Sequence, residues 1–241
     1  MKVNNEKEFM MSEIYAFGDS VLKGVILEND KYKVCKNRFS NICENVLNIV
    51  VENKAKFGST ITTGKKSFEK NREVLTNPDI EYIVLEFGGN DCDFNWKEVS
   101  ENPNIEHQAN NTIEDFIKTY TEIIQTIKQY NKKPVLLSLP PIDAERYVKH
   151  VSKDLDRNNI LKWMKGNTQF LTNWHERYNI EVFKLAMNNH ISIIDITSKF
   201  LEQKNYTKFL CQDGIHPNEE GHKLISGVIQ EHIKRKNIEF N

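Results

Sequence analysis

The chain has 241 residues, of which 39% are hydrophobic and 28% are charged. That composition is ordinary for a globular protein and excludes a disordered or collagen-like chain. Lysine and arginine together number 33, aspartate and glutamate 34, and the formal net charge is −1. Because the charges balance, the sequence gives no electrostatic signal for a nucleic-acid partner or an anionic membrane surface.

The four cysteines form no C-x-x-C pair and no cluster with zinc-type spacing; they are Cys35, Cys43, Cys92 and Cys211. We interpret them as free thiols. The first residues lack the apolar run of a secretory signal. No segment reaches the roughly 18 apolar residues that a transmembrane helix needs. These observations predict a protein of the reducing cytoplasm.

Five short apolar segments, in chain order, are typical of buried strands: residues 13–17, 47–51, 82–87, 134–139 and 191–196. Most of them are apolar on both faces. Parallel strands that are covered by helices on both sides of a sheet have this pattern.

Longer segments with apolar residues at helical spacing alternate with these strands, at residues 37–46, 112–130, 174–187 and 219–233. The alternation predicts an α/β fold with a parallel sheet and right-handed crossovers. The sequence has no internal repeat, low-complexity segment or flexible linker. We therefore expect a single domain over residues 1–241.

Polar, glycine-containing turns follow three of the strands, and a fourth lies near the C-terminus. They are Gly-Asp-Ser at 18–20, Phe-Gly-Ser-Thr at 57–60, Gly-Gly-Asn-Asp at 88–91 and Asp-Gly-Ile-His-Pro at 213–217. Parallel α/β sheets bind ligands at the carboxyl ends of their strands. The turns supply the groups needed for acyl transfer by a serine nucleophile. Singly, each has a structural explanation, such as a serine that caps a helix; in combination they favour a catalytic site.

This combination resembles the SGNH hydrolases, also called the GDSL esterase/lipase family. The resemblance rests on GDS at 18–20, Gly58, GGND at 88–91 and DGIHP at 213–217, and it spans about residues 13–235. It implies a three-layer α/β/α, flavodoxin-like fold with a five-stranded parallel sheet and helical insertions. It also implies a serine hydrolase that acts on ester bonds.

The resemblance assigns roles to five residues. Ser20 matches the nucleophile, His216 the general base and Asp213 the carboxylate that orients the base. The backbone N–H groups of Ser20 and Gly58 and the side-chain amide of Asn90 match the oxyanion hole. A serine hydroxyl needs such a base, and three donors stabilise the negative charge that develops on the substrate oxygen. No cofactor and no metal are implied.

Two departures and one competitor qualify the match. Val21 stands where many members of the family have Leu or Ile. Leu22 occupies the last position of a G-x-S-x-G pattern, so a nucleophile elbow is not supported. Gly64 competes with Gly58 for the oxyanion hole. We prefer Gly58 because it lies closer to the second strand and because Thr60 follows it at the family's spacing.

None of the other histidines lies in a D-x-x-H-P context; they are His107, His150, His175, His190, His222 and His232. His175, beside Trp174, is a candidate pocket residue, although a packed or solvated role is favoured. Cys92 and Cys211 lie close to the motifs, and we assign both to packing.

The sequence favours a serine esterase that hydrolyses a short acyl ester, in particular an acetyl ester, of a small or carbohydrate substrate through an acyl-Ser20 intermediate. It shows no lipid-interface helix or apolar lid. A thioesterase or lysophospholipase with the same triad stays open, as does a non-catalytic binding protein on the same fold. The expected partner is a small-molecule ester, without nucleic acid or membrane; oligomeric state is not indicated. Insertions at about 92–111 and 142–173 are expected to select the substrate, the second as helices over one edge of the sheet.

Overall fold

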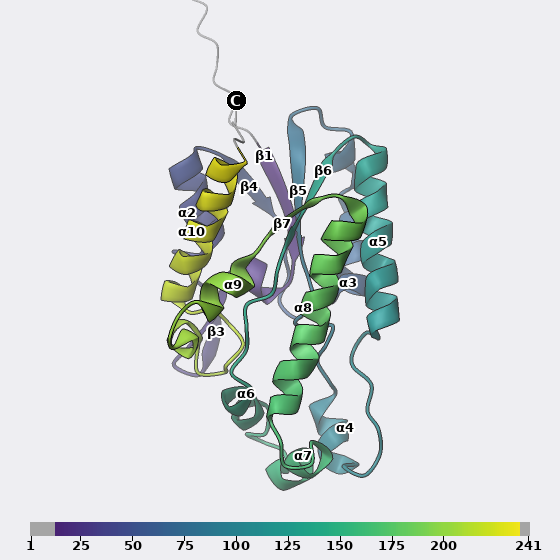
Figure 1. Ribbon diagram of the computed structural model, residues 1–241, viewed down its shortest axis with the longest axis vertical. Coiled ribbons are helices and arrows are strands. Elements are labelled where there is room, and N and C mark those ends of the chain that lie inside the picture. Colours follow the sequence, from purple (N-terminus) through teal and green to yellow (C-terminus); the bar gives the residue numbers. More distant parts are fainter. Residues whose placement is uncertain (1–12, 237–241) are drawn as a thin grey trace, which may run out of the picture.

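The computed structural model describes residues 13–236. Its centre is a sheet of five parallel strands in the order β4-β1-β5-β6-β7 (Figure 1). The strands are β1 (Glu13–Gly18), β4 (Val50–Asn53), β5 (Ile80–Glu86), β6 (Lys133–Leu137) and β7 (Ser192–Ile194). The order is that of flavodoxin-like folds, so the predicted α/β fold with a parallel sheet is confirmed.

Helices cover both faces of this sheet (Figure 1). One face packs against α3 (Ile61–Lys70), α5 (Ile113–Gln129) and α8 (Gln169–Asn189). The other packs against α2 (Phe39–Leu47), α9 (Ile196–Leu201) and α10 (Glu219–Arg235). Ala16 and Phe17 are neighbours in β1 yet lie in opposite cores, because successive side chains of a strand point to opposite faces.

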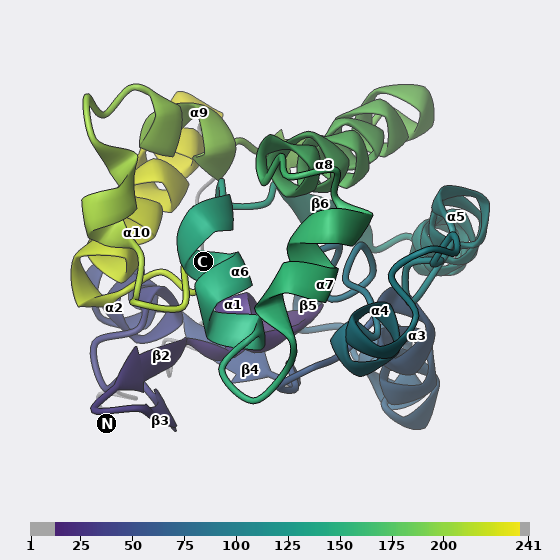
Figure 2. The same cartoon turned by 90° about the horizontal axis from the view of Figure 1, so that it is seen from below.

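The remaining elements are short: α1 (Ser20–Lys23), β2 (Val25–Glu28), β3 (Lys31–Val34), α4 (Trp96–Glu101), α6 (Ala144–Val151), α7 (Arg157–Trp163) and the 3-10 turns Arg72–Leu75 and Tyr206–Phe209. The strands β2 and β3 form an antiparallel hairpin apart from the central sheet. Figures 1 and 2 show α1, α4, α6 and α7 gathered beyond the carboxyl ends of the parallel strands.

The structure moves several predicted boundaries by a few residues, and two of the shifts are the largest. The second strand begins at Val50 instead of residue 47, because Leu47 ends α2 and Asn48 follows in the left-handed conformation, with φ at 53°. The helix expected from residue 174 begins at Gln169. The segment 142–173 does contain helices, as expected, but they lie beyond the strand ends and not over an edge strand.

Among residues 13–236, no helix combines the length and apolar character needed to cross a membrane.

Candidate active site

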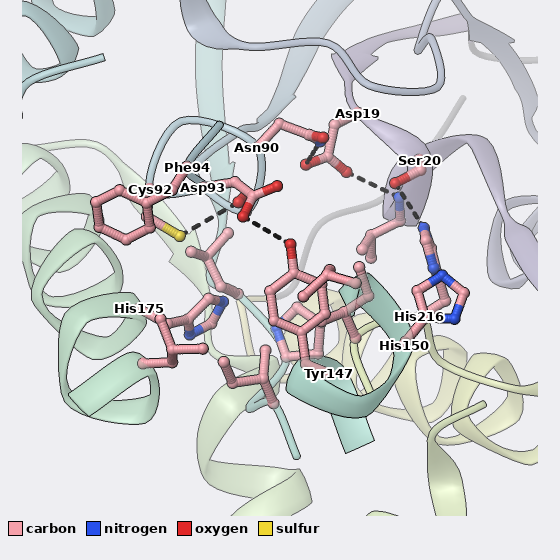
Figure 3. Close-up of a pocket in the computed structure, with 18 of the residues that line it drawn as sticks. Asp19, Ser20, Asn90, Cys92, Asp93, Phe94, Tyr147, His150, His175 and His216 are labelled. Carbon is pink, nitrogen blue, oxygen red and sulfur yellow. Dashed lines mark hydrogen bonds between the residues drawn. The ribbon is translucent and has the colours of Figure 1, made fainter. Parts of the chain in front are cut away.

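A cavity of about 260 Å³ lies beyond the carboxyl ends of the central strands. Its wall includes Ser20 after β1, Asn90 after β5 and Pro140 after β6. This is the position where parallel α/β sheets bind ligands. Figure 3 shows its side chains, which come from segments far apart in the sequence.

Ser20, His216 and Asp213 form one hydrogen-bonded chain in this cavity. Nε2 of His216 lies 2.8 Å from Oγ of Ser20, although the two residues are 196 positions apart (Figure 3). Nδ1 of His216 lies 2.7 Å from Oδ2 of Asp213. All three residues are buried. The geometry is that of a hydroxyl, an imidazole and an orienting carboxylate in series.

The loop that carries His216 is fixed by its own backbone. Oδ1 of Asp213 accepts the N–H groups of Ile215 and His216 at 3.1 and 3.2 Å. Gly214 has a φ of 79°, and a Cβ there would lie 2.4 Å from the carbonyl oxygen of Asp143. The N–H of Asp143 donates to the Gly214 carbonyl at 2.8 Å. Only glycine fits this position. The Asp143–Gly214 hydrogen bond ties the loop to the start of α6.

The electrostatics of the loop favour an ionised carboxylate. Burial raises the pKa of Asp213, but the hydrogen bond and charge of His216, together with the two backbone N–H groups, outweigh it. The pKa of Asp213 therefore lies below its ordinary value. An ionised Asp213 accepts a proton-bearing Nδ1, which leaves Nε2 free to accept the Ser20 proton.

The start of α1 leaves the Ser20 hydroxyl available. Asp19, not Ser20, is the N-cap of this helix, because Oδ1 of Asp19 accepts the N–H of Val21 at 2.8 Å. The structural alternative, in which Ser20 caps the helix, is therefore wrong.

The structure places the three oxyanion-hole candidates differently. Ser20 and Asn90 line the cavity, and Nδ2 of Asn90 donates to Oδ2 of Asp19 at 3.0 Å. Gly58 is exposed and is not part of the cavity wall, although its neighbour Phe57 is.

The competitor Gly64 lies inside α3, where its N–H donates to the carbonyl of Thr60 and a Cβ would meet the Phe87 ring at 2.3 Å. The N–H of Gly64 is used within the helix, and the close Phe87 ring explains why this position is a glycine.

Asp91, the last residue of the GGND motif, fixes the neighbouring loop. Its Oδ1 accepts the N–H of Ile61, the first residue of α3, and the side-chain amide of Asn111, each at 2.8 Å. Burial is the main reason that the pKa of Asp91 rises to about 7. Asp91 thereby anchors the helix that follows the Gly58 loop.

A family model described as the GDSL-like lipase/acylhydrolase family matches residues 16–224. The chain belongs to this family. The resemblance read from the motifs is confirmed, and membership makes the protein an ester-hydrolysing enzyme. No match was found among curated proteins.

Solved structures share the fold over nearly the whole chain. A lipase/acylhydrolase from Enterococcus faecalis is 18% identical, with a TM-score of 0.63 over 96% of this chain and 98% of that one. A lipolytic protein of the G-D-S-L family from Veillonella parvula is 19% identical, with a TM-score of 0.64 over 92% and 98%. A catalytic mutant of an acetylxylan esterase from Geobacillus stearothermophilus is 15% identical, with a TM-score of 0.63 over 92% and 94%.

In this GDSL-like hydrolase, an aromatic wall that the sequence analysis missed covers His216. The ring of Tyr32, on β3, lies 5.3 Å from the imidazole, and the ring of Phe57 stacks on it at 6.0 Å. The Tyr32 hydroxyl and Nε2 of His150 are 2.8 Å apart, so α6 holds the hairpin over the site. Burial is the main reason that the pKa of His150 is lowered.

A second missed feature is a pair of buried acids, Glu86 and Asp19. Oε2 of Glu86 accepts the N–H of Leu22 at 3.3 Å, and that of Asp19 at 3.5 Å. Burial, and then the charge of Asp19, raise the pKa of Glu86 well above its ordinary value. Through these two hydrogen bonds Glu86 holds the turn between β1 and α1. The sequence did contain a signal for this buried acid, because Glu86 is a charged residue within the apolar segment 82–87.

Both expected insertions contribute to the cavity wall. Segment 92–111 supplies Cys92, Asp93 and Phe94, and segment 142–173 supplies side chains such as Ile142 and Tyr147. The first turns of α8 complete the wall with Leu171, Trp174 and His175. His175 is buried, which agrees with the packed role favoured from the sequence. It also lines the pocket, as the alternative role predicted.

The four cysteines are free and buried, as expected. Cys92 lines the cavity, and its Sγ donates to the carbonyl of Gly89 at 3.2 Å. Burial raises the pKa of Cys92 well above its ordinary value, which keeps the thiol protonated and unreactive. Within residues 13–236, no group of three or more His, Cys, Asp or Glu side chains could hold a metal ion.

Proposed function

We propose that this protein is a serine esterase that hydrolyses a short acyl ester, in particular an acetyl ester, of a small or carbohydrate substrate. The observation that carries the proposal is the buried Ser20–His216–Asp213 chain, with contacts of 2.8 and 2.7 Å, at the wall of a small cavity.

In the proposed reaction, Oγ of Ser20 attacks the ester carbonyl carbon while Nε2 of His216 takes its proton. The tetrahedral intermediate collapses to an acyl-Ser20 ester, and the alcohol leaves with the proton from His216. Water then attacks the acyl carbon with His216 as base, releasing the acid and restoring Ser20. Asp213 holds the imidazole in the required tautomer throughout.

We assign the oxyanion hole to the backbone N–H groups of Ser20 and Gly58 and to the side chain of Asn90. The amide nitrogen of Asn90 carries two protons. One is directed to Asp19, and the other remains for the substrate oxygen. Losing one oxyanion donor typically lowers turnover by about 10²–10³.

The size of the cavity favours a small substrate. Its volume of about 260 Å³ lies below the roughly 300–1,000 Å³ of common ligand pockets. A long acyl chain, as in a lysophospholipid, would extend beyond it. Acetylxylan esterases among the structural neighbours support an acetylated carbohydrate. The buried free thiols support the proposed cytoplasmic location.

A fluorophosphonate probe with mass spectrometry tests the nucleophile. We expect labelling of Ser20 in the wild type and in Ser198→Ala, whose serine is exposed on α9, and none in Ser20→Ala. If Ser20→Ala keeps wild-type turnover of p-nitrophenyl acetate, the nucleophile assignment is wrong.

A substrate panel tests the specificity. It compares acetylated sugars, p-nitrophenyl esters of increasing chain length and acyl-CoA thioesters at matched concentrations. The proposal expects the highest kcat/KM for acetyl esters. A preference for long chains or for thioesters would replace the proposed substrate class, and a folded protein inactive on every ester would favour the non-catalytic binding role.

A further inference from the structure

The cavity contains a carboxyl group that takes no part in the proposed triad. Asp93 lines the wall, and its Oδ1 accepts two hydrogen bonds, from the Tyr147 hydroxyl at 2.6 Å and from Nε1 of Trp96 at 2.8 Å. No side chain of residues 13–236 donates to its other oxygen, Oδ2. Figure 3 shows Asp93 across the cavity from Ser20 and His216.

Among residues 13–236, no positive charge acts on this carboxyl group. The groups that influence its pKa are burial, which raises it, and three neutral donors, which lower it: the Tyr147 hydroxyl, the backbone N–H of Phe94 and the Trp96 indole. Burial prevails, and the pKa of Asp93 lies above its ordinary value. A buried carboxyl group with an oxygen that receives no side-chain donor gains from a donor that a ligand brings into the cavity.

His175 supplies a second polar group to the wall of the cavity. It is 5% exposed and lines the wall, and Nδ1 has no hydrogen-bond partner among the described residues. Glu176 lies 3.8 Å from Nδ1, beyond hydrogen-bond distance but within reach of an ion pair when the ring is protonated, and His175 helps to lower the pKa of Glu176. Figure 3 shows both His175 and Asp93 on the side away from Ser20 and His216, with other side chains of the wall between them.

We propose that Asp93 and His175 form a subsite that binds hydroxyl groups on the alcohol part of the substrate. This inference rests on the proposed esterase function and makes it more specific. The substrate is then an ester of a polyhydroxylated alcohol, such as a sugar ring. Its ester carbonyl lies at Ser20, and its free hydroxyls meet Asp93 and His175.

Hydroxyl groups suit this pair better than a cation or an alkyl chain does. A hydroxyl both donates and accepts, so it can donate to Oδ2 of Asp93 and pair with either tautomer of His175. An ammonium group only donates, so it could pair with only one tautomer of the imidazole. An alkyl chain would leave both polar groups buried without partners, which is costly.

The test compares two acetate esters of similar size. One is a monoacetylated methyl xyloside, whose ring carries free hydroxyls, and the other is cyclohexyl acetate, whose ring carries none. The ratio of their kcat/KM values is measured for the wild type, Asp93→Asn and His175→Phe. In Asp93→Asn the amide oxygen can still accept from Tyr147 and Trp96, while an N–H donor replaces the acceptor at the Oδ2 position. Asp79→Asn, in the exposed turn before β5, is the matched control.

We expect Asp93→Asn and His175→Phe each to lower the ratio by about 10- to 100-fold, because the first replaces the acceptor at the Oδ2 position with a donor and the second removes the polar ring. Thermal unfolding of both variants checks that they fold, and turnover of cyclohexyl acetate, whose ring carries no hydroxyl, should fall less than that of the xyloside. Asp79→Asn should leave the ratio unchanged. An unchanged ratio in both cavity variants overturns the subsite.

Acetylcholine serves as a cationic acetate ester. If it exceeds the xyloside in kcat/KM and loses that advantage in Asp93→Asn, the cavity binds a cation and the hydroxyl subsite is wrong. Failure of the underlying function has a different signature, because Ser20→Ala would then retain turnover of every ester, including those without hydroxyls.

Discussion

His222, on α10, is expected to make the protein acid-sensitive. It is fully buried, its ring lies 5.7 Å from that of Phe39, and neither ring nitrogen has a hydrogen-bond partner among the described residues. Burial lowers the pKa of His222 to about 4, with the charges of His216 and Arg38 acting in the same direction and Glu219 opposing them. The neutral ring is therefore the form that the fold accepts.

The sign and size of the effect follow from these values. In the unfolded chain His222 should titrate near the ordinary pKa of about 6.5. Between pH 6.5 and about 4 the unfolded chain binds a proton that the folded protein does not, so stability falls as the pH falls through this window. The difference between the two pKa values corresponds to about 3 kcal/mol at 1.36 kcal/mol per pKa unit.

Urea unfolding at pH 7 and at pH 4.5 measures this contribution in the wild type, in His222→Leu and in the control His190→Asn, whose histidine is exposed. We expect His222→Leu to lose about 2–3 kcal/mol less than the wild type between the two pH values, and His190→Asn to lose as much as the wild type. Equal losses in His222→Leu and the wild type would refute the reasoning.

Three further substitutions test the site and its support. Asp213→Asn should lower kcat on p-nitrophenyl acetate by about 10⁴, because an amide N–H facing Nδ1 of His216 fixes the wrong tautomer; a loss below about tenfold in folded protein contradicts this role. Gly214→Ala should lower the free energy of unfolding by about 1–3 kcal/mol and also reduce kcat, since it combines a left-handed φ with a clash at the Asp143 carbonyl; thermal unfolding and steady-state kinetics measure both. Ser138→Ala should cost about 1–3 kcal/mol in urea unfolding, because Oγ of Ser138 accepts two backbone N–H groups at the start of α9. An undiminished stability would show that those groups find other partners, and kcat should be unchanged.

The central strands and the polar turns at their carboxyl ends could be predicted from the sequence, because both have a distinct residue pattern. Parallel strands buried on both faces must be apolar throughout, so all five strands could be predicted to within a few residues. The polar turns could be placed together because carboxyl ends of parallel strands share one edge of the sheet. That edge does hold Ser20, Asn90 and His216 at one cavity. The role of Gly58 stays a prediction.

The hairpin β2–β3 was missed because its strands are only four residues long and β3 is exposed along its length. A local signal was present. Asn29 and Asp30 have φ values of 51° and 57°, as a tight hairpin turn requires at both central positions. What could not be read from the sequence was that Tyr32 would reach His216, since that contact depends on the arrangement of elements that are distant in the chain.

The exposure of β3 has a consequence for motion at the site. β3 lies outside the central sheet and buries little apolar surface, so it should open locally at a lower free energy than the whole fold. Its amide protons should then exchange with solvent faster than those of β1 or β5. Because Tyr32 covers the His216 imidazole, each such opening would uncover the imidazole while the sheet stays intact, so hairpin opening would control how often solvent reaches it from this side.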